Sequence, residues 1–249
     1  PNIDYDKAQS LVDLAYKNGV NYFDTAYMYH CGKSEAFIGY ALKKYPRDTY
    51  FIADKLPIWL CDTKEDMKRV FDEQLERTGM DYFDFYLLHS LDNENFEKCE
   101  KFDAYDFLKK MQKEGKIKYI GFSFHGTVDD LRNIVSAHKW DFAQIQMNYL
   151  DWENDIIQSR LCYETARRHN KPIAVMESVK GGTLANLPKE AENILREYNK
   201  EASPASYALR FAANLDGVFM VLSGMSNCEQ VLDNTKTVSY THLTLPTTH

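Results

Sequence analysis

The chain alternates short runs of β-forming residues with segments of helical periodicity, and this alternation extends over most of its 249 residues. One helical segment precedes the first run and one follows every run, giving seven strands and eight helices. A strand followed by a helix, repeated, produces parallel strands joined by helical crossovers. The runs, rich in β-branched and aromatic residues, lie at residues 22–25, 50–53, 85–88, 119–122, 143–146, 173–176 and 218–222.

Two parallel architectures suit this length: an open doubly wound sheet and a closed barrel of about 250 residues. Seven strands with a helix at each end favour an α/β protein of the (β/α)8 TIM barrel type that lacks its first strand and is truncated at the C-terminus. No GxGxxG segment follows any run, which weakens the doubly wound dinucleotide-binding alternative. We expect one partial barrel domain over residues 1–237, with two unpaired strand edges.

Residues 238–249 form a segment of a different character, because they contain no acidic residue, lysine or arginine and no helical period of their own. Translating a transposon-type sequencing adapter on its reverse strand yields residues 238–248 in order, so we interpret residues 238–249 as a foreign tail. The alternative is a genuine C-terminal strand, since Val, Tyr, Thr and Leu are all common in strands.

The composition narrows the range of partners. Thirty basic and 37 acidic side chains give a net charge of −7, which argues against binding to nucleic acid or an anionic membrane. No apolar run approaches the roughly 18 residues of a membrane helix, and no signal-peptide pattern opens the chain. The five cysteines form no CxxC pair, so we expect reduced thiols, a cytoplasmic location and small-molecule partners.

Four polar residues lie at or just after the ends of three consecutive strands, where barrel enzymes place their active sites. Asp24 ends the first run, Tyr29 follows in its loop, and Lys55 and His89 end the next two strands. An adjacent ammonium lowers the pKa of a phenol from its ordinary value of about 10. Asp24 can keep Lys55 charged, and His89 can orient a carbonyl oxygen. The set predicts a proton donor beside a carbonyl whose carbon accepts a hydride.

The segments around these residues resemble the aldo-keto reductases. Residues 23–32, with the sequence FDTAYMYHCG, are similar to the DTAxxYG segment of that family, although two residues separate Tyr29 from the glycine. Residues 81–89 are similar to the stretch that carries its active-site histidine, and residues 115–123 and 203–210 add family-like segments. The resemblance extends over nearly the whole chain, to about Lys236.

This resemblance implies an oxidoreductase that reduces an aldehyde, ketone or quinone carbonyl by hydride transfer from NAD(P)H, with Tyr29 as the general acid. It also implies that Ser123 and Gln146 hold the nicotinamide carboxamide. Other cofactor contacts are expected near the adenosine phosphate, just before and within the last helix. The matching residues there are Ser223, Gly224, Gln230 and Asn234.

The chain departs from the family pattern at three positions. Phe124 replaces an asparagine that usually touches the carboxamide, and Met176 replaces an aromatic ring that commonly stacks on the nicotinamide. Neutral Gln230 stands in the place of an arginine, with Glu229 beside it, so we expect a weak preference for NADPH, or a preference for NAD(H).

Two glycine-containing segments, residues 121–126 and 176–182, are more similar to a bacterial branch of the family. That branch carries an iron–sulfur ferredoxin-like segment after the barrel. The sequence contains no cysteine cluster of that kind, so we expect an iron–sulfur cluster only in a longer, untruncated protein.

Two other classes of function stay open at this point. One is a non-catalytic redox-sensing module that binds nucleotide without turnover. The other is a metal-dependent barrel hydrolase, in which Lys55 and His89 would serve a metal centre whose ligands could lie on the missing first strand. His30 and His125 lie near the same mouth, but two imidazoles from distant loops are more often surface groups than metal ligands. Because the last strand ends in Ser223 and Gly224 without a carboxylate, we expect no metal.

Overall fold

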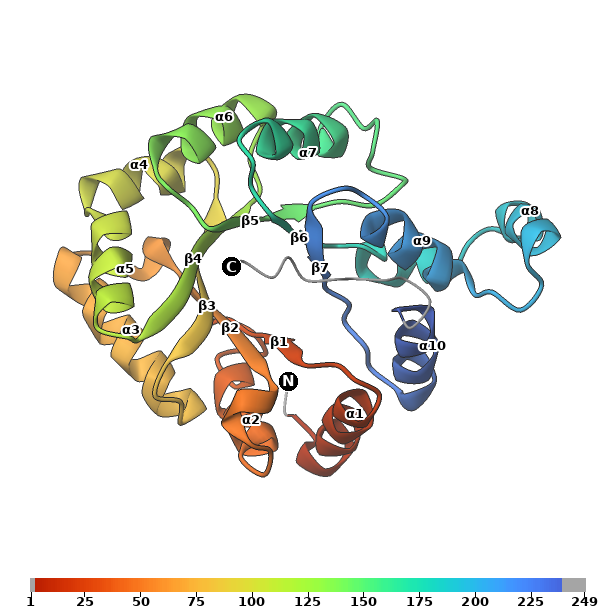
Figure 1. The fold of residues 1–249 in the computed structure, drawn as a ribbon, viewed down its shortest axis with the longest axis horizontal. Coiled ribbons are helices and arrows are strands. Elements are labelled where there is room, and N and C mark those ends of the chain that lie inside the picture. Colours follow the sequence, from red (N-terminus) through yellow and green to blue (C-terminus); the bar gives the residue numbers. More distant parts are fainter. Residues whose placement is uncertain (1–2, 239–249) are drawn as a thin grey trace.

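Seven parallel strands, hydrogen-bonded in chain order, form a curved sheet in the computed structural model, which describes residues 3–238 (Figure 1). Within that range β1 and β7 each pair with one neighbour, so the sheet is one strand short of a closed eight-stranded barrel. The predicted α/β barrel fold is confirmed. The strands are β1 (Tyr22–Asp24), β2 (Phe51–Leu56), β3 (Phe83–Leu91), β4 (Ile117–Phe124), β5 (Phe142–Gln146), β6 (Ile173–Met176) and β7 (Val218–Val221).

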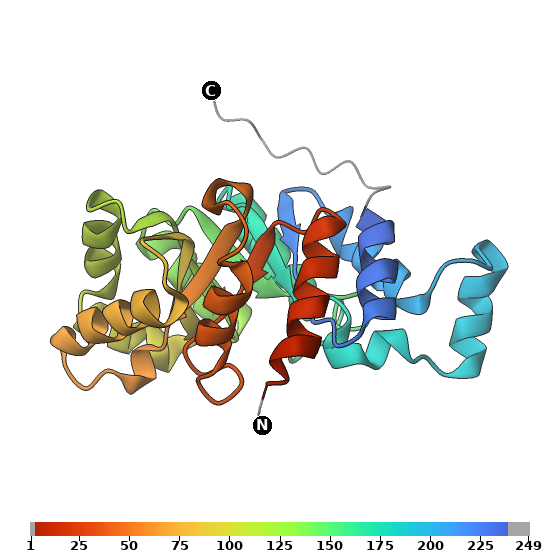
Figure 2. The same ribbon diagram turned by 90° about the horizontal axis from the view of Figure 1, so that it is seen from below.

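Helices surround the outer side of the sheet, and α1 and α10 pack against each other beside its open edge (Figures 1 and 2). The described residues hold ten α-helices, two more than expected, because α4 and α8 are additional helices within the connections after β3 and β6. The helices are α1 (Tyr5–Lys17), α2 (Ser34–Leu42), α3 (Lys64–Thr78), α4 (Asn93–Lys101), α5 (Ala104–Lys113), α6 (Val128–Ala137), α7 (Ser159–Arg168), α8 (Lys189–Tyr198), α9 (Pro204–Ala213) and α10 (Cys228–Val238).

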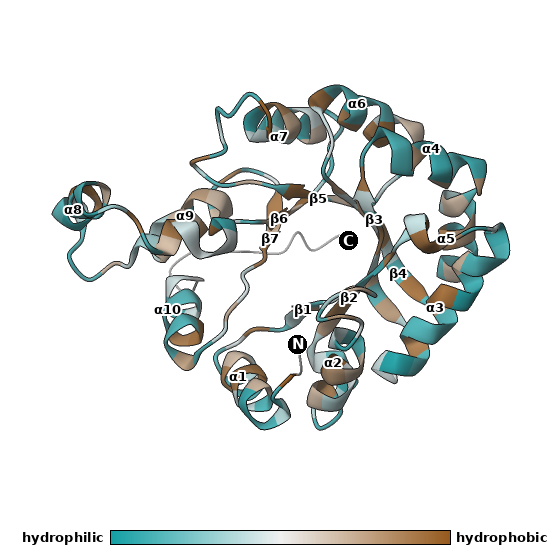
Figure 3. Cartoon of the chain, turned by 180° about the vertical axis from the view of Figure 1, so that it is seen from behind, coloured by the Kyte–Doolittle hydropathy of each residue, from teal (hydrophilic) through white to brown (hydrophobic). Residues whose placement is uncertain are grey.

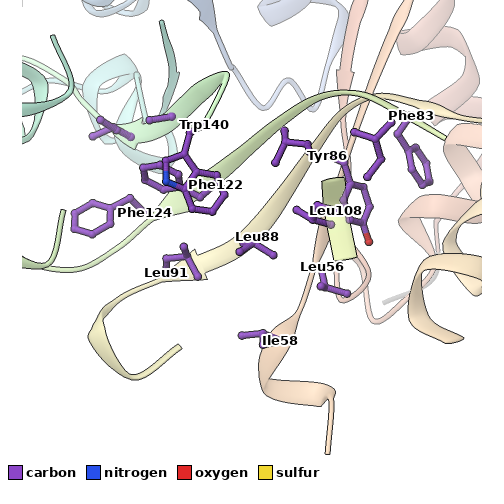
Figure 4. Close-up of a cluster of buried hydrophobic side chains, with 14 of the residues drawn as sticks. Leu56, Ile58, Phe83, Tyr86, Leu88, Leu91, Leu108, Phe122, Phe124 and Trp140 are labelled. Atoms are coloured by element: carbon purple, nitrogen blue, oxygen red, sulfur yellow. The ribbon is translucent and has the colours of Figure 1, made fainter. Parts of the chain in front are cut away.

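The strands bury side chains on both faces. On the inner face, Tyr22, Ala53, Leu87 and Phe142 belong to one apolar cluster. The larger cluster lies between the sheet and the helices, where hydrophobic residues concentrate (Figures 3 and 4). Since successive side chains of a strand point to opposite faces, Lys55 shares the inner face of β2 with Ala53.

Local sequence signals explain several helix boundaries. In α3, Thr63 and Asp66 form a capping box, and Gly79 ends the helix in the left-handed conformation. In α9, Ser203 caps the N-terminus and Pro204 occupies the first turn. These helices therefore begin or end where the neighbouring residue types favour a helix terminus.

The predicted tail lies almost entirely outside the described residues. Val238 is the last residue of α10, and residues 239–249 are not described. The interpretation of residues 238–249 as a foreign tail, and of residues 1–237 as one partial domain, therefore stays a prediction. Among the residues that the structure covers, none of the helices is both long and apolar enough to span a bilayer.

Helices α2 and α3 cross so closely at Gly39 that a Cβ atom there would overlap the backbone carbonyl of Thr78. Gly39→Ala should therefore lower the free energy of unfolding by about 1–3 kcal/mol, although alanine improves helix propensity by about 1 kcal/mol. Thermal and urea denaturation measure the change. Ala36→Gly, at an exposed position of the same helix, calibrates the propensity effect. An unchanged or more stable Gly39→Ala variant would contradict the close crossing.

Candidate active site

The four predicted catalytic residues come together at the carboxyl ends of β1, β2 and β3. The Lys55 ammonium lies 2.6 Å from Asp24 Oδ1, 2.7 Å from the carbonyl oxygen of Thr25 and 3.4 Å from the Tyr29 hydroxyl. The Tyr29 ring meets the His89 imidazole edge-on, with the ring centroids 5.9 Å apart. A cation, a carboxylate, a phenol and an imidazole thus share one mouth of the barrel.

Burial and neighbouring charges together set the protonation states of the cation and the phenol. The Lys55 side chain is 0% exposed. Burial by itself lowers its pKa, but Asp24 and Tyr29 raise it by a larger amount, so the net pKa is above its usual value. Burial raises the pKa of Tyr29 by more than Lys55 lowers it. The sequence analysis predicts that the ammonium lowers the pKa of Tyr29, whereas in the structure the net pKa is raised. The structure instead gives a phenol that stays protonated at neutral pH.

His89 is neutral at physiological pH. Burial, followed by the charges of Lys55 and His125, lowers its pKa to about 3. Its Nδ1 atom is buried and has no hydrogen-bond partner in the part of the chain that is described. The Trp59 ring lies 5.1 Å from the imidazole and forms one wall beside it. A neutral imidazole can donate one ring N–H to a substrate oxygen.

The residues expected at a nicotinamide, Ser123 and Gln146, lie on β4 and β5, and Gln144 is a further polar residue of β5. Ser123 Oγ accepts a hydrogen bond from the backbone N–H of Ser90 at 2.7 Å. Gln146 donates to Asp151 at 3.2 Å, so its amide is engaged with the following loop. Gln144 pairs in register with Ser123, and its buried Oε1 has no partner among residues 3–238.

Gln144 is a candidate that the sequence analysis did not name, although the spacing of the two glutamines on β5 could have indicated it. Residues 144 and 146 are two apart on β5, so both side chains point to the same face of the strand. Periodicity alone does not distinguish them. Only the pairing of β4 with β5 shows which glutamine lies level with Ser123.

A left-handed turn after β6 is a second feature that the sequence analysis did not assign. Lys180, Gly181 and Gly182 all have positive φ angles. The backbone N–H groups of Lys180 and Gly182 donate to the carbonyl oxygens of Glu177 and Val179, so they close the turn itself. The Lys180 ammonium reaches both carboxylate oxygens of Asp151, at 2.6 and 2.8 Å. This ion pair links the loops after β5 and β6.

The four residues expected near the adenosine phosphate lie around the start of α10. Asn234 donates to Ser223 Oγ at 3.0 Å, and Gln230 Oε1 accepts from the Ser226 backbone at 2.7 Å. Gly224 is exposed in the same turn. Gln230 therefore closes the turn that precedes α10.

Residues 1–245 match the model of the Aldo/keto reductase family. The chain belongs to this family. An aldo-keto reductase of Gibberella moniliformis is 32% identical over an alignment of 152 residues, and the match covers 58% of this chain and 45% of that protein. The NADH-specific methylglyoxal reductase of Escherichia coli is 25% identical over 266 residues, covering 88% and 79% of the two chains.

A solved aldo-keto reductase of Bacillus halodurans, in its holo form, has a TM-score of 0.76 and 25% identity to this family member, covering 98% of this chain and 85% of the other. The chain spans less than half the length of several curated relatives that it matches. The family resemblance is confirmed. The resemblance to the iron–sulfur branch stays a prediction.

The low pKa of His89 predicts a loss of stability in acid for this family member. Below pH 6.5, the ordinary histidine pKa, the unfolded chain binds a proton at residue 89 that the folded chain binds only near pH 3. The free energy of unfolding should fall with decreasing pH by up to about 1.4 kcal/mol per unit, and His89→Gln should remove this contribution.

Urea denaturation between pH 7 and about pH 4.5 measures this difference. His169→Gln, at an exposed position, is the matched control and should keep the acid dependence of the parent. Parallel curves for the parent and His89→Gln would contradict a neutral buried imidazole.

Proposed function

We propose that this protein is an oxidoreductase that reduces an aldehyde, ketone or quinone carbonyl, with NAD(P)H as hydride donor and Tyr29 as general acid. The observation that carries the proposal is the buried Lys55 ammonium between Asp24 and the Tyr29 hydroxyl. The Escherichia coli relative is named as a methylglyoxal reductase, which supports a small carbonyl substrate.

In this mechanism the Tyr29 hydroxyl transfers its proton to the carbonyl oxygen. The nicotinamide, when bound, supplies the hydride that the carbonyl carbon accepts. Lys55 stabilises the phenolate that remains, and Asp24 holds the ammonium in place. The neutral imidazole of His89 donates a hydrogen bond that orients the carbonyl oxygen. The Tyr29 phenol is protonated at neutral pH, as a general acid must be before the reaction, because its pKa lies above the ordinary value of about 10.

The residues present fit a nicotinamide cofactor. A carboxamide needs both a donor and an acceptor, and the unpaired Gln144 Oε1 beside Ser123 offers an acceptor in a buried position. We therefore assign Ser123 and Gln144 to the carboxamide, with Gln146 as a neighbour. Ser223, Gly224, Gln230 and Asn234 remain the candidates at the adenosine end.

Other features of the chain agree with a reductase in a reducing compartment. All five cysteines are free thiols, which suits the cytoplasm. Within residues 3–238 no group of three or more His, Cys, Asp and Glu side chains is arranged to hold a metal ion. The nucleotide-binding module without turnover is separated from the reductase by the experiment that follows.

Tyr29→Phe removes only the hydroxyl, so turnover should fall by about 100- to 10,000-fold while the dissociation constant of the nucleotide stays nearly unchanged. Loss of NAD(P)H absorbance with a panel of small aldehydes, ketones and quinones measures turnover. Lys55→Met should be similarly damaging, Asp24→Asn milder, and His89→Gln should mainly raise KM. Tyr40→Phe, at a tyrosine that is 57% exposed on α2, is the control. Parental turnover in Tyr29→Phe would favour the module without turnover.

The neutral side chain at position 230 predicts weak discrimination between the two nucleotides, or a preference for NADH, because no charge-assisted pair with a 2′-phosphate forms there. Fluorescence titration with NADH and NADPH measures both constants. Gln230→Arg should tighten NADPH binding, whereas Gln230→Ala controls for loss of the hydrogen bond to Ser226. An NADPH constant about a hundredfold tighter in the parent, roughly 2.7 kcal/mol, would overturn this prediction.

A further inference from the structure

A cluster of polar side chains lies behind Lys55, on the outer face of β2. Gln74 of α3, Asp54 of β2, Glu35 of α2 and Tyr86 of β3 all have relative exposures of 0%. Figure 4 shows the Tyr86 ring among the apolar side chains of this region. Polar groups are costly to bury without partners, so the hydrogen bonds of the cluster need a structural or functional explanation.

Gln74 is the centre of the cluster. Its Nε2 atom lies 2.8 Å from Asp54 Oδ1, 2.9 Å from Glu35 Oε1 and 3.0 Å from the carbonyl oxygen of Lys55. Its Oε1 atom accepts a hydrogen bond from the Tyr86 hydroxyl. One amide thus connects two helices and two strands.

The cluster holds the backbone of Lys55 on both sides of its Cα atom. Asp54 Oδ1 accepts from the Lys55 backbone N–H at 2.8 Å, and Gln74 donates to the Lys55 carbonyl oxygen. The Lys55 side chain leaves the opposite face of the strand and ends 3.4 Å from the Tyr29 hydroxyl. A rotation of this backbone segment would therefore move the ammonium relative to the phenol.

The two carboxyl groups of the cluster, Glu35 and Asp54, differ in their ionic partners. Glu35 pairs with Arg77 at 3.0 Å. Asp54 has no such cation on the outer face in the described structure, and its buried Oδ2 has no hydrogen-bond partner there. Burial, followed by the charge of Glu35, holds the pKa of Asp54 well above its usual range. Lys55 and Asp24, which lie 2.6 Å apart, form the ion pair at the mouth on the other face of β2.

We propose that Gln74 and Asp54 are positioning residues that set the distance between the Lys55 ammonium and the Tyr29 hydroxyl. This inference rests on the proposed function, in which Lys55 assists proton transfer from Tyr29. It predicts that disturbing the cluster changes the proton-transfer step while nucleotide binding at β4 to β6 stays intact.

Gln74→Met keeps an unbranched side chain of similar length and removes the amide. The value of kcat should fall by about 10- to 100-fold, because small misplacements of reacting groups have effects of this size. The solvent deuterium isotope effect on kcat should rise, since proton transfer becomes more rate-limiting. The dissociation constant for NADH should stay within about twofold of the parent value. Thr78→Val, one turn later on α3 and also buried, is the matched control for lost stability and should leave the isotope effect unchanged.

Two further variants keep the test decisive if Gln74→Met does not fold. Tyr86→Phe removes only the hydroxyl that holds Gln74 and should raise the isotope effect by a smaller amount. Asp54→Asn retains an acceptor for the Lys55 N–H and should lower kcat less than Asp54→Leu does.

The outcomes separate the two proposals. If Tyr29→Phe loses turnover while Gln74→Met and Tyr86→Phe keep the parental kcat and isotope effect, the positioning role is wrong and the proposed function stands. If Tyr29→Phe turns over at the parental rate, the proposed function itself fails. An equal isotope-effect change in Thr78→Val would also overturn the positioning role, because general loss of stability would then explain the result.

Discussion

The site depends on one buried charge. The Lys55 ammonium is removed from solvent and lies inside the sheet, where an unpaired cation would be strongly unfavourable. Its partners are a carboxylate from β1, a backbone carbonyl just after β1 and a phenol from the following loop. The ammonium therefore constrains the pairing of β1 with β2 and the path of the β1–α2 loop. The same contacts hold Tyr29 next to His89.

The two faces of β2 carry different parts of this arrangement. Lys55 extends from the inner face to the mouth, while Asp54 extends from the outer face to Gln74 and Glu35. The outer contacts require α2 and α3 to approach each other closely, and Gly39 permits that approach because it has no side chain. Packing between two helices is thus linked to the geometry of a lysine on the other side of the sheet.

The loops after β5 and β6 complete the mouth on the side of the proposed cofactor. The ion pair between Asp151 and Lys180 joins these loops, and Gln144 is left with an unpaired buried acceptor. The contacts of Lys55 hold the polar groups at the ends of β1 to β3, whereas the ion pair between Asp151 and Lys180 holds the loops after β5 and β6. This separation suits a reaction in which proton donation and hydride donation come from different sides of the carbonyl.

The sequence by itself determined the order of strands and helices, the family, and the four residue types at consecutive strand ends. It could do so because hydrophobic periodicity and capping residues are local signals. The register that sets Gln144 level with Ser123, the Asp54 cluster and the additional helices α4 and α8 were decided by the tertiary structure. The direction of the Tyr29 pKa shift was decided there too, because burial outweighs the neighbouring ammonium. Strand register and depth of burial depend on contacts between residues distant in the chain. The periodicity of a single segment carries no information on those contacts.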